Sequence, residues 1–88
     1  MNWDRLEHDF GVAEYNSIHE TVFLYTGDSQ LRQESFQKSC GCTEPVWDAV
    51  NKTLKVGLHM NVRGLKSTTV LVQDPAGVTI LKVKALVK

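Results

Sequence analysis

The chain has 88 residues and a mass of 9.9 kDa, which is the size of one domain and too small for a core together with a deep catalytic cleft. Ten Lys and Arg residues balance ten Asp and Glu residues, and this neutral charge argues against a strongly electrostatic nucleic-acid binder. No apolar run approaches the ~20 residues that a membrane helix needs, and a hydrophobic content of 42% excludes a disordered chain.

Short apolar segments separated by turn residues follow one another along the chain, which is typical of an all-β sandwich or barrel. In the N-terminal half we expect strands over Asp4–Phe10 and Ser17–Tyr25. Leu31–Lys38 is a weaker strand prediction because it is rich in Gln and Glu. Pro45 interrupts the chain after the cysteines and indicates a sheet edge or a crossing.

The C-terminal half has the clearest period-two pattern. Apolar and polar residues alternate over Lys52–Val62 and again over Val78–Val87. Between them, Leu65–Gln73 contains β-branched residues that favour a strand. The segment 48–51 could form a helical turn but nothing longer. We therefore predict that residues 1–88 form a single all-β domain, an immunoglobulin-like antiparallel β-sandwich of about seven strands.

Two cysteines, Cys40 and Cys42, flank Gly41. A disulfide between them would close a small, strained ring and remove little chain entropy, so two thiols in a reducing compartment are the simpler interpretation. Such a pair could also hold copper(I), whereas structural zinc needs about four ligands and the histidines are scattered. Three alternatives stay open: a tight, partly buried turn, a metal site, and a disulfide or redox pair. We expect no resident metal or cofactor.

Four residues are candidates for partner binding: Trp3, Trp47, Leu86 and Val87. Tryptophan is enriched at binding hot spots, although core packing also explains Trp47. The chain stays apolar through Leu86 and Val87, so the last strand either pairs within its sheet or presents an edge to a partner.

The segment Ser39–Thr43 has the sequence SCGCT, preceded by D-F-G at Asp9–Gly11 and followed by P-x-W at Pro45 and Trp47. In this order the motifs resemble a bacterial domain-of-unknown-function family marked by an SCGCT box, which is related to ASH-type (abnormal-spindle and hydin-like) immunoglobulin-like domains. The resemblance covers roughly residues 8–87. It implies an immunoglobulin-like fold and carries no catalytic residues. Gln33 departs from it, since the family has an apolar residue there.

No serine lies in a nucleophile elbow and the N-terminus has no secretory signal pattern. We therefore expect a non-enzymatic module that docks on a larger assembly, specifically a virion accessory protein for decoration, neck or tail. Its partners would be proteins of a multi-subunit assembly such as a phage particle, with no nucleic acid and no membrane. Its location would be the virion, assembled in the host cytoplasm, or alternatively a bacterial cytoplasm. The alternative function is a thiol or copper(I)-binding protein that uses Cys40 and Cys42.

Overall fold

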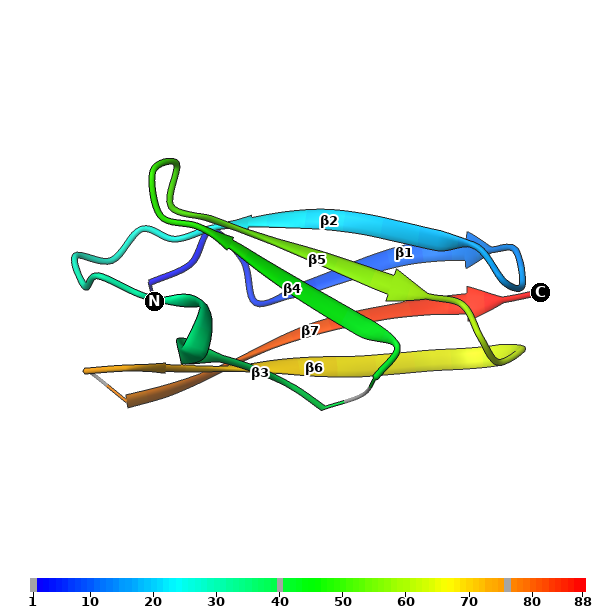
Figure 1. Ribbon diagram of the computed structural model, residues 1–88. Coiled ribbons are helices and arrows are strands. Elements are labelled where there is room, and N and C mark those ends of the chain that lie inside the picture. The colour runs from blue at the N-terminus through cyan, green and yellow to red at the C-terminus, as the bar shows by residue number, and fades with distance from the viewer. Residues whose placement is uncertain (1, 40, 76) are drawn as a thin grey trace.

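Two β-sheets pack face to face in the computed structural model, which describes residues 2–39, 41–75 and 77–88 (Figure 1). The strands are β1 (Glu7–Ala13), β2 (Ile18–Leu24), β3 (Phe36–Lys38), β4 (Thr43–Asp48), β5 (Thr53–His59), β6 (Gly64–Asp74) and β7 (Gly77–Val87). One sheet has the order β1-β7-β6-β3 and the other the order β2-β5-β4. A 3₁₀ turn, η1 (Gln33–Ser35), precedes β3, and the described residues contain no α-helix.

The predicted seven-stranded β-sandwich is confirmed, with one correction to its strand directions. Strand β1 runs parallel to β7, while all the other strand pairs are antiparallel. The remaining six strands divide as in immunoglobulin domains, with β2, β5 and β4 on one sheet and β3, β6 and β7 on the other. The parallel pairing makes β7 an interior strand, so the C-terminal strand presents no edge.

Strand β1 contains a bulge that the sequence pattern did not reveal. Its register with β7 shifts between Asp9 and Val12, and Gly11 has a φ of 73°, which a residue with a side chain rarely adopts. The bulge lets the strand continue to Ala13 instead of ending at Phe10. Its start at Glu7 is later than predicted, because the preceding segment leaves the sheet to pack on β2.

Three further expectations need correction in whole or in part. The predicted strand Leu31–Lys38 is mostly the turn η1, with only three residues in β3. Pro45 lies at a sheet edge, as predicted, but it does not interrupt the chain there: it is buried within β4, an edge strand in which a missing N–H is tolerated. Residues 49–52 form a turn rather than helix, since Asp48 Oδ1 accepts bonds from the N–H groups of Val50 and Asn51.

The core lies between the sheets and is filled by alternate residues of each strand. Its aliphatic part includes Leu54, Val56, Leu58, Val70, Val72, Leu81 and Val83. One end is closed by aromatic rings: the centroid of Trp3 lies 5.0 Å from that of Tyr25, 6.2 Å from Phe36 and 6.3 Å from Trp47. This cluster ties the N-terminal segment, the β3 strand and the β4 strand together.

Candidate functional site

The free edge of β4 is covered by one side chain. The Nε2 group of Gln33 donates a hydrogen bond of 2.8 Å to the carbonyl of Pro45. The backbone N–H of Trp47 donates to Oε1 of the same glutamine at 2.9 Å. The amide of Gln33 thus takes the place that a peptide group of a further strand would occupy. Because Pro45 has no N–H, this part of the edge has little left to offer an incoming strand.

The free edge of β2 is covered by the N-terminal segment. Arg5 Nη1 donates to the carbonyl of Val22 at 2.9 Å. Asp4 Oδ1 accepts from the N–H of Leu24 at 3.0 Å, and the N–H of Asp4 donates to the carbonyl of Leu24 at 3.0 Å. The Arg5 guanidinium also lies 4.6 Å from the ring centroid of Phe23. Strand addition is therefore hindered along the second half of β2.

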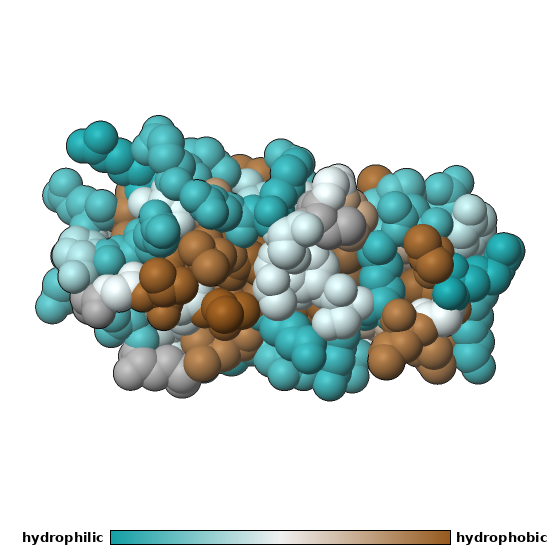
Figure 2. Space-filling view, turned by 90° about the horizontal axis from the view of Figure 1, so that it is seen from below, coloured by the Kyte–Doolittle hydropathy of each residue, from teal (hydrophilic) through white to brown (hydrophobic). Residues whose placement is uncertain are grey.

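The outer face of the four-stranded sheet carries exposed aliphatic side chains instead. We define this outer face as the outward-pointing residues of β1, β6 and β7. On β6 and β7 it is built from five cross-strand pairs: Leu65–Leu86, Ser67–Lys84, Thr69–Lys82, Leu71–Ile80 and Gln73–Val78. Figure 2 shows hydrophobic surface at both ends of the molecule, with hydrophilic and neutral surface between them. Leu65 is 81% exposed and Ile80 is 55% exposed.

One pair of charged side chains on the outer face, Glu7 and Lys84, forms an ion pair within the chain. Lys84 Nζ lies 2.8 Å from Glu7 Oε1. Through this hydrogen bond and its charge, Lys84 holds the pKa of Glu7 below its ordinary value of 4.5, and Glu7 raises the pKa of Lys84 above 10.5. Asp9 accepts a bond of 2.8 Å from the N–H of Gly11. Both members of the ion pair therefore stay charged at neutral pH.

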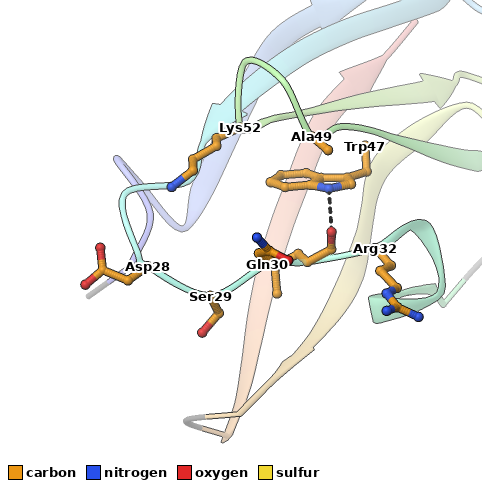
Figure 3. Close-up of a pocket in the computed structure, with 8 residues that line it drawn as sticks. Asp28, Ser29, Gln30, Arg32, Trp47, Ala49 and Lys52 are labelled. Carbon is orange, nitrogen blue, oxygen red and sulfur yellow. Dashed lines mark hydrogen bonds between the residues drawn. The ribbon is translucent and has the colours of Figure 1, made fainter.

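A pocket of about 450 Å³ lies at one end of the sandwich, between the loop 28–32 and the turn after β4. In Figure 3 the indole of Trp47 lies over this loop, and its Nε1 donates to the carbonyl of Leu31 at 2.9 Å. Lys52 Nζ donates to the carbonyl of Gly27 at 3.4 Å. Both contacts hold the loop on the sandwich, so these polar groups act in closing this end of the domain.

The four predicted partner-binding residues do not lie together. Trp3 is 1% exposed and pairs with Tyr25 through an isolated β-bridge, and Val87 is 2% exposed. Both are core residues rather than surface anchors, because the N-terminal segment folds back on the sandwich and β7 lies inside its sheet. Trp47 is half-buried against the core. Leu86 is 40% exposed on the outer face, where it neighbours Leu65.

The predicted cysteine site is described in part. Cys42 is half-buried, packs against the core and is disulfide-bonded, so it is not one of two free thiols. Cys40 lies outside the described residues. Within the parts of the chain that are described, no group of three or more His, Cys, Asp or Glu residues could hold a metal ion. The described segments also include no helix long and apolar enough to cross a membrane.

The sequence did not lead us to predict the apolar residues of the outer face or the hydrogen bonds by which Gln33 covers the edge of β4. Leu65 and Leu71 are in phase with each other along β6, and Ile80 is in phase with the lysines of β7. Ile80 is separated from Lys82 and Lys84 by even numbers of residues, so all three side chains point to the same side of the sheet. An aliphatic residue on the same side as exposed lysines is the feature of the sequence from which this face could have been predicted. For Gln33, the only signal was the polar residue itself, at a position where the resemblance led us to expect an apolar one.

Comparison with known proteins identifies a matching protein family. A family model described as "Protein of unknown function (DUF1573)" matches residues 1–87. The comparisons with curated proteins and with solved structures gave no match. Since the family match spans nearly the whole chain, the protein belongs to the DUF1573 family of proteins of unknown function.

Proposed function

We propose that this DUF1573 domain is a non-enzymatic interaction module that docks on a larger protein assembly through the outer face of its four-stranded sheet. The observation that carries the proposal is the set of aliphatic side chains at both ends of that face. Leu65 and Ile80 project into solvent although the core beneath them is filled by other residues. Clustered apolar side chains on a surface mark interaction sites more often than scattered ones do.

Both edges of the three-stranded sheet are partly occupied, which disfavours docking by strand addition there. Gln33 occupies the edge of β4, and Asp4 and Arg5 occupy much of the edge of β2. An incoming strand would have to displace these bonds. A partner on the outer face would displace none of them, and it would meet side chains held on β6 and β7, the longest strands of the sandwich. Such preorganised side chains lose little freedom on binding.

The assembly we propose is a virion, with the domain as a bacteriophage decoration, neck or tail protein assembled in the host cytoplasm. The small size and balanced charge of the chain suit an accessory protein present in many copies. The SCGCT box and its resemblance to ASH-type immunoglobulin-like domains support the same class, since small immunoglobulin-like sandwiches serve as accessory proteins on virions. This step is an analogy of fold and size. The bacterial cytoplasm is the alternative location.

The alternative function, a thiol or copper(I) site at Cys40 and Cys42, gains no support from the described geometry. Copper(I) is held by thiolates, and Cys42 is disulfide-bonded.

Sedimentation of a native lysate tests the docking role. The chain is detected by mass spectrometry in each fraction, and we expect it to travel with a megadalton particle in fixed stoichiometry to a major structural protein. A variant with Leu71→Lys and Ile80→Lys should leave the particle fraction. The matched control, Val50→Lys, changes a side chain that is 91% exposed in the turn after β4, and it should remain with the particle. Wild-type protein found only at the size of a free chain would refute the proposal.

A further inference from the structure

We infer that the partner of the outer face is a second copy of this chain, related by a two-fold axis that runs parallel to the strands between β6 and β7. This inference rests on the proposed docking role of the face and names what covers it. The contact through which the domain joins its assembly would then be this contact between two copies of the chain.

The register makes the face self-complementary under such an axis. The axis places β6 of one copy over β7 of the other at the same height along the strands. Leu65 and Leu86 are cross-strand neighbours, so Leu65 of one copy would meet Leu86 of the second copy, and the reverse. At the other end, Leu71 would meet Ile80 of the second copy in the same way. Each apolar end thus packs on the apolar end of its symmetry mate.

The charged middle of the face agrees with the same axis. Lys82 and Lys84 are the neighbours of Thr69 and Ser67 on β6. Each lysine would therefore face a hydroxyl group of the second copy. The ion pair of Lys84 with Glu7 stays within its own chain, and the flexible lysine stems allow the ammonium groups to reach solvent at the rim.

A two-fold axis running across the strands would fail electrostatically. If it crosses β7 at Val83, in the middle of the charged region, it places β7 over β7 so that Lys82 lies on Lys84 of the second copy. It would also place β1 over β1, so that Glu7 lies on Asp9 of the second copy. Like charges apposed in an interface disfavour binding strongly. Of the two face-to-face arrangements, the charge distribution selects the axis parallel to the strands.

The size of the face is sufficient for a stable pair. The molecule measures 39 × 20 × 20 Å along its principal axes, so full cover of one long face would remove roughly 800 Å² from each copy, which is close to the ~800 Å² per partner of a standard interface. A groove runs from the apolar end of this face, at Val12, Leu65 and Leu86, to its charged middle, and it would receive a side chain of the second copy.

Single substitutions test whether the face is the interface. Sedimentation velocity over a wide concentration range is expected to show a dimer for the wild-type chain. Leu65→Lys and Leu86→Glu should each weaken the dimer by roughly tenfold or more, because each inserts a charge into both apolar contacts at that end. Val50→Lys, in the turn after β4, should leave the dimer unchanged. Thermal melts of each variant, read by circular dichroism, check that the fold persists.

Mixing the two variants tests the axis itself. When one copy carries Leu65→Lys and the other Leu86→Glu, the new ammonium and the new carboxylate face each other at one contact, and the second contact keeps both leucines. Native mass spectrometry with one variant isotope-labelled should therefore show heterodimers where each variant alone is monomeric. If Leu86→Glu does not fold, Leu71→Lys mixed with Ile80→Glu makes the same test at the other end.

Each outcome has a definite meaning. A wild-type chain that stays monomeric at high concentration overturns the dimer, and co-sedimentation with a particle then still decides the docking role. A dimer that survives Leu65→Lys, or that Val50→Lys breaks, places the interface elsewhere and overturns the inference. Failure of the mixed variants to associate overturns the proposed axis.

Discussion

The side-chain carbonyl of Gln33 accepts a hydrogen bond of 2.9 Å from the backbone N–H of Trp47, and the amide nitrogen of the same side chain donates to Pro45. A single side chain, from the 3₁₀ turn that precedes β3, thereby satisfies two backbone groups on the free edge of β4. This relationship gives a structural role to a glutamine where the resemblance to the SCGCT-box family implies an apolar residue: the side chain acts as a short piece of a further strand.

Replacing Gln33 with alanine is expected to destabilise the domain by about 1–2 kcal/mol, because two hydrogen bonds are lost and each contributes about 0.5–1.5 kcal/mol. Urea unfolding measures this change, and amide hydrogen exchange should become faster at Trp47. The control is Gln37→Ala, an exposed residue of β3, where a change within about 0.5 kcal/mol is expected. Unchanged exchange at Trp47 would mean that Gln33 does not close the edge.

Gly27 is expected to tolerate no side chain, because an added Cβ would collide with the Tyr25 hydroxyl group. Gly27→Ala should cost about 1–3 kcal/mol through overpacking. Within the described residues, the Tyr25 hydroxyl is buried and lacks a hydrogen-bond partner. Tyr25→Phe alone should therefore be nearly neutral or stabilising.

The double variant of Gly27→Ala with Tyr25→Phe should be more stable than the sum of the single effects, since removal of the hydroxyl relieves part of the collision. A thermodynamic cycle from urea unfolding measures this coupling. Strict additivity would show that the two residues are not in contact.

Trp3→Ala is expected to destabilise the domain by about 3–5 kcal/mol, the usual range for removing a large aromatic side chain from a core. Trp3 is 1% exposed and lies among other aromatic rings. Leu65→Ala is the contrasting variant, because Leu65 is 81% exposed and a change within about 0.5 kcal/mol is expected. Thermal or urea unfolding at low protein concentration compares the two, and a neutral Trp3→Ala would contradict the core assignment.

The ion pair between Glu7 and Lys84 should contribute a small stabilisation that depends on pH. The pKa of Glu7 is lower in the folded chain than its ordinary value of 4.5, because Lys84 donates a hydrogen bond to it and attracts its charge. Its contribution is therefore complete above pH 4.5 and is lost as the pH falls through the folded pKa. For Lys84 the pH dependence runs in the opposite direction. Its pKa is raised in the folded chain, so its contribution to stability is complete below pH 10.5 and is lost as the pH rises through the folded pKa.

Glu7→Gln should flatten the acid side of the stability profile, measured as the urea midpoint from about pH 7 to about pH 3. High salt should reduce the difference from wild type, since the pair is exposed to solvent. The control is Glu34→Gln in the turn η1, where the described residues offer no ion pair. An identical acid profile for Glu7→Gln and wild type would show that the pair does not form in solution.

Local alternation was enough to predict the C-terminal strands. The expected ranges Lys52–Val62, Leu65–Gln73 and Val78–Val87 each overlap the observed β5, β6 and β7 closely, because every second residue of these strands faces one core. In the N-terminal half, the expected strand Ser17–Tyr25 also matches β2 closely, whereas Asp4–Phe10 and Leu31–Lys38 were predicted less well. Strand β3 has three residues and depends on β6 for its hydrogen bonds, so its own composition says little about it.

The candidate site was predicted poorly because exposure is a property of the fold. A tryptophan near a chain end gives no sign of whether it is buried. Trp3 is buried because its segment crosses to β2 and Tyr25. Leu65 is exposed because β6 turns its other alternate side chains, such as Val70 and Val72, toward the core. The alternating pattern alone does not show which of the two sets of side chains is buried.

The amino-acid order alone was sufficient for the class of fold, the neutral charge and most strand positions, since these depend on neighbours along the chain. The tertiary structure alone decided the parallel pairing of β1 with β7, the closure of the β4 edge by Gln33 and the aliphatic residues left on the outer face. These features join residues far apart in sequence. The free energy of these contacts depends on which strands and side chains pack against each other in the folded chain. The pattern of neighbouring residues along the sequence does not specify that packing.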